Sequence, residues 1–186
     1  GKSMTDSLKY TLGALVVLIG IYFYNQNVQR SYTVPDSSIF SGIPEDIHRV
    51  LISEGDNALE LVRSDTTWRI TQADSLLIKE NQIKNLFDRL LAVKMEMLIS
   101  RNETKWEKFG VDDSLGRHLQ AFNDKDKKLI HYIFGNAGQD YQHNYIRELN
   151  SAEVYRTNDN VYFLLNTSAT YWGKSPPKPK ELETDL

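Results

Sequence analysis

Residues 80–94 read Glu-Asn-Gln-Ile-Lys-Asn-Leu-Phe-Asp-Arg-Leu-Leu-Ala-Val-Lys, and this stretch decides the fold class. Its apolar side chains recur with the spacing i, i+3, i+4, i+7 and i+8, at Ile83, Leu86, Phe87, Leu90 and Leu91. The spacing predicts an amphipathic helix with one buried face. Such a helix needs an apolar surface to cover, and the flanking segments are expected to supply a sheet.

Short, partly β-branched runs on both sides of this helix predict strands. Before it, the runs 48–53, 58–63 and 67–70 alternate with turn residues, which is typical of a three-stranded meander. After it, strands are expected at 95–100, 118–122, 128–134, 144–148 and 153–156, with a hairpin turn over Asn123–Lys127. A helical turn ended by Gly110 is expected at Trp106–Asp112, and a last helix from Asn160 towards Trp172. We therefore predict an α+β fold of antiparallel β-meanders packed with amphipathic helices, whose order hints at a duplicated meander-plus-helix unit.

The segment Tyr10–Tyr24 contains no charged residue and predicts a membrane anchor. The residues after it lack the small-residue pattern of a signal-peptide cleavage site, so we expect the anchor to be retained. A buried core helix is the alternative, but the segment is apolar on every face and precedes a polar stretch. The expected organisation is an N-terminus at 1–9, an anchor at 10–26, a linker at 27–42, an α+β domain at 43–174 and a proline-rich charged tail at 175–186.

The charges that flank the anchor predict its orientation. Lys2 and Lys9 lie on the N-terminal side, whereas Arg30 is the nearby cation on the other side. The positive-inside tendency then favours a cytoplasmic N-terminus and an extracytoplasmic domain. In a bacterium this places the protein in the cytoplasmic (inner) membrane with its domain in the periplasm. Gly13 and Gly20 lie on one helix face and could let a second transmembrane helix approach closely.

Composition excludes several functional classes. The net charge of −3 provides no basic field of the kind that a nucleic-acid-binding protein uses. The sequence has no cysteine, which rules out disulfides, thiolate catalysis and cysteine-ligated metals. It also contains no nucleophile elbow and no phosphate-binding glycine loop. We predict that the protein is not an enzyme, with no catalytic, cofactor-binding or metal-ligating residues and no cofactor.

Two groups of residues remain as candidates for a site. His118 and His131 fall on adjacent strands of the predicted hairpin, and we interpret them as solvated strand histidines rather than metal ligands, since Leu119 and Ala121 should face the core. The loop 136–144 mixes polar and aromatic residues, and its partner-contact candidates are Asn136, Asp140, Tyr141 and His143. A flexible hairpin tip is an equally good interpretation of this loop.

The order of several short motifs resembles a known family, the domain-of-unknown-function family numbered 4340. The motifs are Trp68-Arg69-Ile70, the helix at 80–94, Phe109-Gly110-Val111-Asp112, Ile133-Phe134-Gly135, Tyr145-Ile146-Arg147, Val154-Tyr155 and Trp172. The resemblance covers residues from about 40 to 175. The chain departs from the family pattern by lacking a proline after the tryptophan strand, and by having Lys79 where an aspartate commonly caps the helix. The resemblance implies an accessory role at a membrane, beside ABC-type transport or gliding-motility components, and carries over no catalytic residue.

Together these features predict a non-catalytic accessory or scaffold subunit of a membrane protein complex. It would contact the bilayer through residues 10–26 and other subunits through its extracytoplasmic domain. The family resemblance implies that these subunits belong to an ABC-type transport assembly. A structural subunit of a respiratory or photosynthetic membrane complex is the main alternative. An enzyme or small-ligand binder is the third hypothesis, and it would need a concave pocket with converging polar groups.

Overall fold

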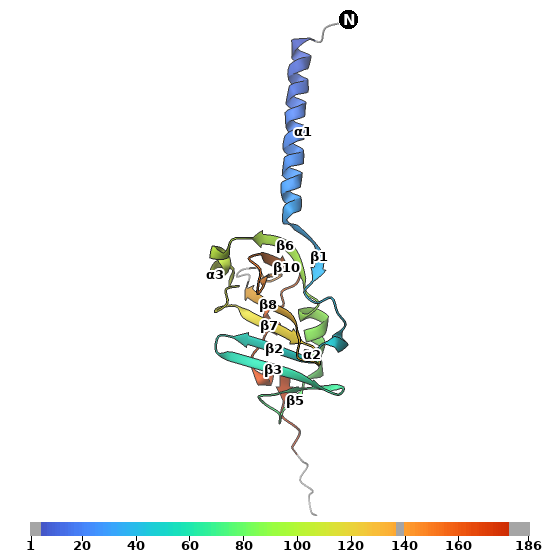
Figure 1. Ribbon diagram of the computed structural model, residues 1–186, viewed down its shortest axis with the longest axis vertical. Helices are drawn as coiled ribbons and strands as arrows, with labels where there is room; N and C mark the ends of the chain where they lie inside the picture. The colour runs from blue at the N-terminus through green and yellow to red at the C-terminus, as the bar shows by residue number, and fades with distance from the viewer. Residues whose placement is uncertain (1–4, 137–139, 179–186) are drawn as a thin grey trace, which may run out of the picture.

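The computed structural model describes residues 5–136 and 140–178. One long helix, α1 (Asp6–Tyr32), extends away from an α+β domain (Figure 1). The domain is built on a nine-stranded antiparallel sheet with the strand order β1-β6-β10-β9-β8-β7-β2-β3-β4. A two-stranded sheet of β5 and β11 lies beyond it. The predicted fold class, an apolar N-terminal helix followed by an α+β domain with antiparallel strands, is confirmed.

The strands follow the predicted segments closely. The first meander is β2 (Arg49–Glu54), β3 (Asn57–Ser64) and β4 (Thr67–Ile70). The second meander is β7 (Arg117–Phe122), β8 (Lys128–Asn136), β9 (Asn144–Glu148) and β10 (Val154–Thr157). β2 pairs with β7, and β6 (Lys94–Ser100) pairs with β10. The two meanders thus form one continuous sheet, and they differ in their number of strands.

One face of the sheet carries the main core, and the helix at 80–94 covers it. Val50, Ile52, Leu59 and Leu61 on the first meander are fully buried there, as are Leu86 and Leu90 of the helical segment. The segment begins as α2 (Glu80–Asn85) and continues as a single π turn, η2 (Leu86–Leu90). The π turn inserts an extra residue, as the bond from Leu91 N to Leu86 O (2.8 Å) shows. The helical segment ends at Leu90, earlier than the predicted end at Lys94, and Lys94 is the first residue of β6.

The C-terminal segment closes the same core. Two short helical segments, η4 (Tyr162–Leu164) and α4 (Ala169–Trp172), replace the single helix expected from Asn160. Trp172 is buried, and its Nε1 donates to Asn166 O at 2.7 Å. Lys79, which stands where the family pattern has an aspartate, makes no side-chain cap on α2. Its Nζ donates instead to Thr170 O at 2.7 Å. The N-terminus of α2 is thereby tied to α4.

The connection between α1 and the domain differs from the expected linker over 27–42. The helix continues to Tyr32, and β1 (Thr33–Ser38) begins at the next residue and pairs with β6. A 3₁₀ turn, η1 (Pro44–Asp46), then leads into β2. The short strands β1, β5 (Leu77–Ile78) and β11 (Gly173–Lys174) escaped sequence analysis because they carry no alternating apolar pattern. Of the predicted tail, residues 179–186 lie outside the described residues, as do residues 1–4 of the predicted N-terminus.

Candidate functional site

The second face of the sheet carries a charged clamp, which we define as Trp106, Val111, Asp113 and Arg147. Arg147 on β9 is completely buried, and its guanidinium lies 3.7 Å from the centroid of the Trp106 ring. Its Nε donates to Val111 O (2.9 Å), Nη1 donates to Leu149 O (2.9 Å), and Nη2 pairs with the Asp113 carboxylate. A buried guanidinium is tolerated only when its donors are satisfied. Here the acceptors come from two chain segments, the turn at Val111–Asp113 and the residues that follow β9.

The clamp holds the short helix α3 (Trp106–Phe109) and the turn after it against the sheet. Gly110 ends α3 in the left-handed conformation, with φ of 65°. Gly135 on β8 lies directly beneath, where a Cβ would come within 2.0 Å of Phe109 O. The turn itself is built by Asp112, whose Oδ1 accepts from Ser114 N, Ser114 Oγ and Leu115 N. Burial favours a raised pKa for the Asp112 carboxyl, but these hydrogen bonds outweigh it and lower the pKa.

Beside the clamp, His118 and His131 form one directed chain of hydrogen bonds. His118 Nε2 lies 2.9 Å from Asp113 O, which can only accept, so Nε2 carries the proton. In the neutral ring His118 Nδ1 is then an acceptor, and it lies 2.9 Å from His131 Nε2, which must donate. His131 Nδ1 is left as the acceptor towards Lys128 Nζ at 3.5 Å. The chain thus runs from Lys128 through both imidazoles to the backbone of the clamp residue Asp113.

The two imidazoles point at each other end to end. Their centroids are 5.2 Å apart, which exceeds the nitrogen–nitrogen distance of 2.9 Å by about the sum of the two ring radii. Two imidazoles that share one metal ion would instead converge on a point beside the line that joins them. Both imidazoles are half-buried and hydrogen-bonded to each other, so they are less solvated than the sequence predicted. The expectation that Leu119 and Ala121 face the core is confirmed.

The histidine chain predicts a pH dependence of stability. Burial, together with the positive charges of Lys128 and His118, lowers the pKa of His131 from 6.5 to about 4. The unfolded chain binds a proton here below pH 6.5 and the folded chain does so only near pH 4. Stability is therefore complete above pH 6.5 and falls as the pH drops towards 4, by about 1 kcal/mol once solvent screening of the half-exposed ring is allowed for.

Thermal melts at a series of pH values measure this effect. We expect the melting temperature of the wild type to fall more steeply between pH 6.5 and 4 than that of a His131→Gln variant, which lacks the titrating ring. The carboxylates titrate alike in both proteins, so the difference isolates His131. Parallel melting curves would contradict the prediction.

The predicted contact loop lies at the far end of β8 from its hairpin turn, and residues 137–139 fall outside the described part. Asn136 is exposed at the end of β8, and Tyr141 is 86% exposed. Two hydrogen bonds hold the described part of the loop in place. Asp140 Oδ1 accepts from Gln142 N (2.8 Å), and Asn160 Nδ2 donates to Tyr141 O (3.3 Å). His143 differs from the other three candidates because it is half-buried, and its Nδ1 donates to Thr157 O at 2.7 Å. The structure therefore presents Tyr141 outward and turns His143 to the sheet.

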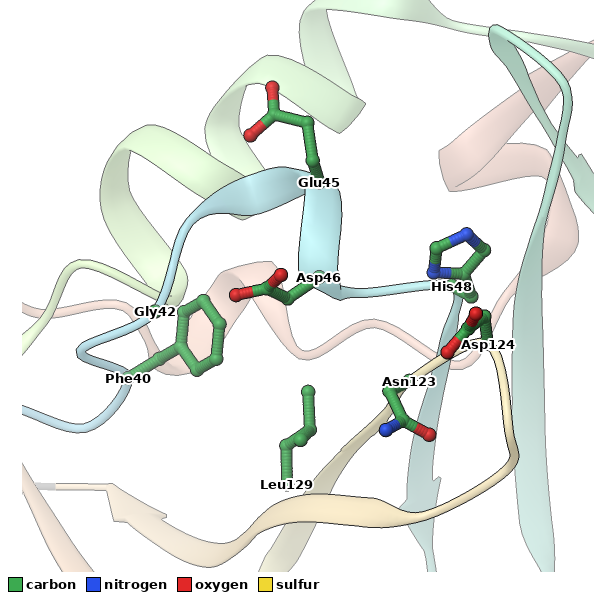
Figure 2. A pocket seen from close by; sticks show the side chains of 8 residues that line it. All are labelled: Phe40, Gly42, Glu45, Asp46, His48, Asn123, Asp124 and Leu129. Carbon is green, nitrogen blue, oxygen red and sulfur yellow. The ribbon is translucent and has the colours of Figure 1, made fainter.

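A cavity of about 480 Å³ opens between the chain segment before β2 and the β7–β8 turn (Figure 2). Its lining is mixed, with the carboxylates of Glu45, Asp46 and Asp124 beside Phe40 and Leu129. The polar groups do not converge: the Glu45 side chain points away from the cavity in Figure 2, and Asn123 Oδ1 accepts from the backbone of its own turn. Sequence analysis had no signal for this cavity, because the lining residues come from segments about 80 residues apart.

Comparison with known proteins identifies one family. Residues 68–177 match the model of the family described as Domain of unknown function (DUF4340), which is more than half of the chain. The match begins at Trp68, whereas the resemblance in the sequence extended back to about residue 40. Searches of curated proteins and of solved structures found no match.

Proposed function

This chain belongs to the DUF4340 family, and on that premise we propose that it is a non-catalytic accessory or scaffold subunit of a membrane protein complex. In this proposal α1 anchors the protein in the cytoplasmic membrane of a bacterium. The α+β domain lies outside the cytoplasm and binds other subunits through the loop at Tyr141.

The exposure of α1 is the observation that carries the proposal. The segment Ser7–Gln26 is long and apolar enough to span a membrane, and none of it is buried against the domain. Its apolar side chains, including Leu15, Leu18 and Phe23, would all contact water in a soluble protein. The domain has a complete core of its own, so burial in lipid is the natural way to remove this surface from water. Tyr10 and Tyr24 lie near the two ends, where aromatic rings favour the interface.

The loop at Tyr141 supports a role in binding. A tyrosine with an almost fully exposed ring on an anchored backbone offers a large contact area at low entropic cost. The resemblance to DUF4340 proteins found beside transporters favours ABC-type transport partners. A respiratory or photosynthetic complex remains the alternative, and the identity of the bound subunits distinguishes the two.

A non-catalytic role is supported by what the polar groups of the domain do. Arg147 and Asp113 are engaged with each other, and His118 with His131, in a hydrogen-bonded arrangement that secures the fold. The cavity of Figure 2 is the best place for the third hypothesis, a small-ligand site. A ligand for which Asp46→Asn abolishes binding would favour that hypothesis over ours.

The proposal is tested by photo-crosslinking of the full chain in its native membrane. A photoreactive phenylalanine at Tyr141 should crosslink to integral membrane subunits, whereas the same group at the exposed Thr66 should not. ATPase and permease subunits would support the transport version, and electron-transfer subunits the alternative. A Tyr141→Ala variant should keep its melting temperature and lose most of its co-purifying partners. Retention of all partners would contradict the proposed role of the loop.

A further inference from the structure

No residue separates the proposed membrane helix from the first strand of the domain. Tyr32 ends α1 and Thr33 begins β1, whose register with β6 sets Thr33 opposite Met97 and Ser38 opposite Lys94. Helix α1 also contacts β6 directly. A helix that passes directly into a paired strand restricts the direction of the sheet, and β1 and β6 are accordingly the strands closest to α1 in Figure 1.

The length of α1 beyond its apolar span sets the height of this strand above the bilayer. The span ends at Gln26, and Thr33 follows seven residues later (33 − 26), which is about 10 Å at a rise of 1.5 Å per residue. The headgroup layer on each side of a bilayer is roughly 5–8 Å thick. Any tilt of the helix lowers Thr33 further. Met97, one strand spacing from Thr33, is therefore level with the phospholipid headgroups or just above them.

An exposed apolar side chain and two cationic side chains lie along β6 and at its end. β1 pairs with β6 only between Lys94 and Met97, so within the described residues the outer edge of Leu98–Ser100 has no partner strand. Met97 is 42% exposed on this strand. At the end of the strand lies a cavity of about 400 Å³, lined by Ile99, Ser100, Arg101, Asn102 and Lys105. Two of these residues are cationic and none is acidic, although Arg101 also pairs with Glu153.

We infer that the outer edge of β6 and the cavity at its end form a surface that lies on the phospholipid headgroups and accepts a lipid phosphate between Arg101 and Lys105. This inference rests on the proposed span. The two cations suit phosphate oxygens, and the exposed Met97 side chain lies at the height of the headgroups. The sheet then stands upright on the membrane, with β4 at its distant edge.

The absence of native cysteines makes a direct test simple. Single cysteines at positions 97, 105, 66 and 24 of the full chain are labelled with an environment-sensitive fluorophore and reconstituted into vesicles of phosphatidylethanolamine and phosphatidylglycerol. Lipids with a nitroxide on the headgroup then quench nearby labels. We expect about twofold or greater quenching at positions 97 and 105 relative to position 66, which lies in the β3–β4 turn. A Lys105→Glu change should reduce the quenching at position 97.

The label at Tyr24 separates the two ways in which the test can fail. Quenching at position 24 without quenching at 97 or 105 would overturn the headgroup surface while leaving the span intact. A label at position 24 that escapes quenching would overturn the span itself, and with it this surface. Circular dichroism melts of each labelled variant establish that the fold is retained.

Discussion

The Arg147→Ala variant is expected to lose about 3–5 kcal/mol of the free energy of unfolding. The change leaves the buried carbonyl of Val111 without this donor, at a cost of about 1–3 kcal/mol, removes a second bond from the part-buried carbonyl of Leu149, and opens a gap beside the Trp106 ring. Asp113 is exposed and would be solvated, so its charge adds little to the loss. Urea titration of the full chain in detergent measures the change.

The matched control is Arg69→Ala. Arg69 pairs with Asp74 at 3.1 Å, but both side chains are largely exposed, and such pairs contribute about 1 kcal/mol or less. Arg147→Lys should fall between the two, because an ammonium keeps the charge and cannot reach all the acceptors of a guanidinium. Equal midpoints for the Arg147→Ala and Arg69→Ala variants would show that the clamp does not stabilise the domain.

Gly135→Ala is the second change with a large expected effect, about 3 kcal/mol or more. The new methyl group would meet backbone atoms of α3 and its turn, at 2.0 Å from Phe109 O and 2.8 Å from Gly110 C. Backbone cannot rotate away as a side chain does, so the turn must move off the sheet. Hydrogen exchange should then rise over residues 106–116 while the amides of β2 and β3 stay protected.

Gly20→Ala provides the control for this substitution. A Cβ at Gly20 meets no atom within 4 Å, and alanine is a better helix former than glycine. The exchange of residues 106–116 should be unchanged in this variant. If Gly135→Ala leaves the same amides protected, then the close approach of α3 to β8 is not needed to hold the turn.

Periodicity in the sequence predicted most of the elements, because burial on one face leaves a repeating signal. The stripe of Ile83, Leu86 and Leu90 predicted the helix over the main core, and the alternation around Leu119 and Ala121 predicted which face of β7 is buried. The missing elements are those without such a signal. β1 pairs at a sheet edge with the sequence Thr-Val-Pro-Asp-Ser-Ser, and the π turn depends on packing rather than on composition.

The charged clamp could not be predicted from the sequence for a different reason. The motifs at Phe109–Asp112, Gly135, Arg147 and Val154 stood out separately, but nothing local shows that they meet in one place. Their meeting depends on the registers of β7, β8, β9 and β10, and a shift of one residue in any of them would turn side chains to the other face. The sequence predicts that His118 and His131 lie on adjacent strands, whereas their link to Asp113 depends on the position of the turn.

The strand order also dictates when the sheet can be completed during synthesis. β10 is four residues long, and in the described part of the chain it lies between β6 and β9. Ser100 at the end of β6 leaves the ribosome 54 residues before its partner Val154 on β10 (154 − 100). Until Val154–Thr157 emerge, a nascent chain holds two unpaired strand edges open to wrong partners. The last short strand thus decides whether the newly made domain closes on itself or on a neighbouring chain.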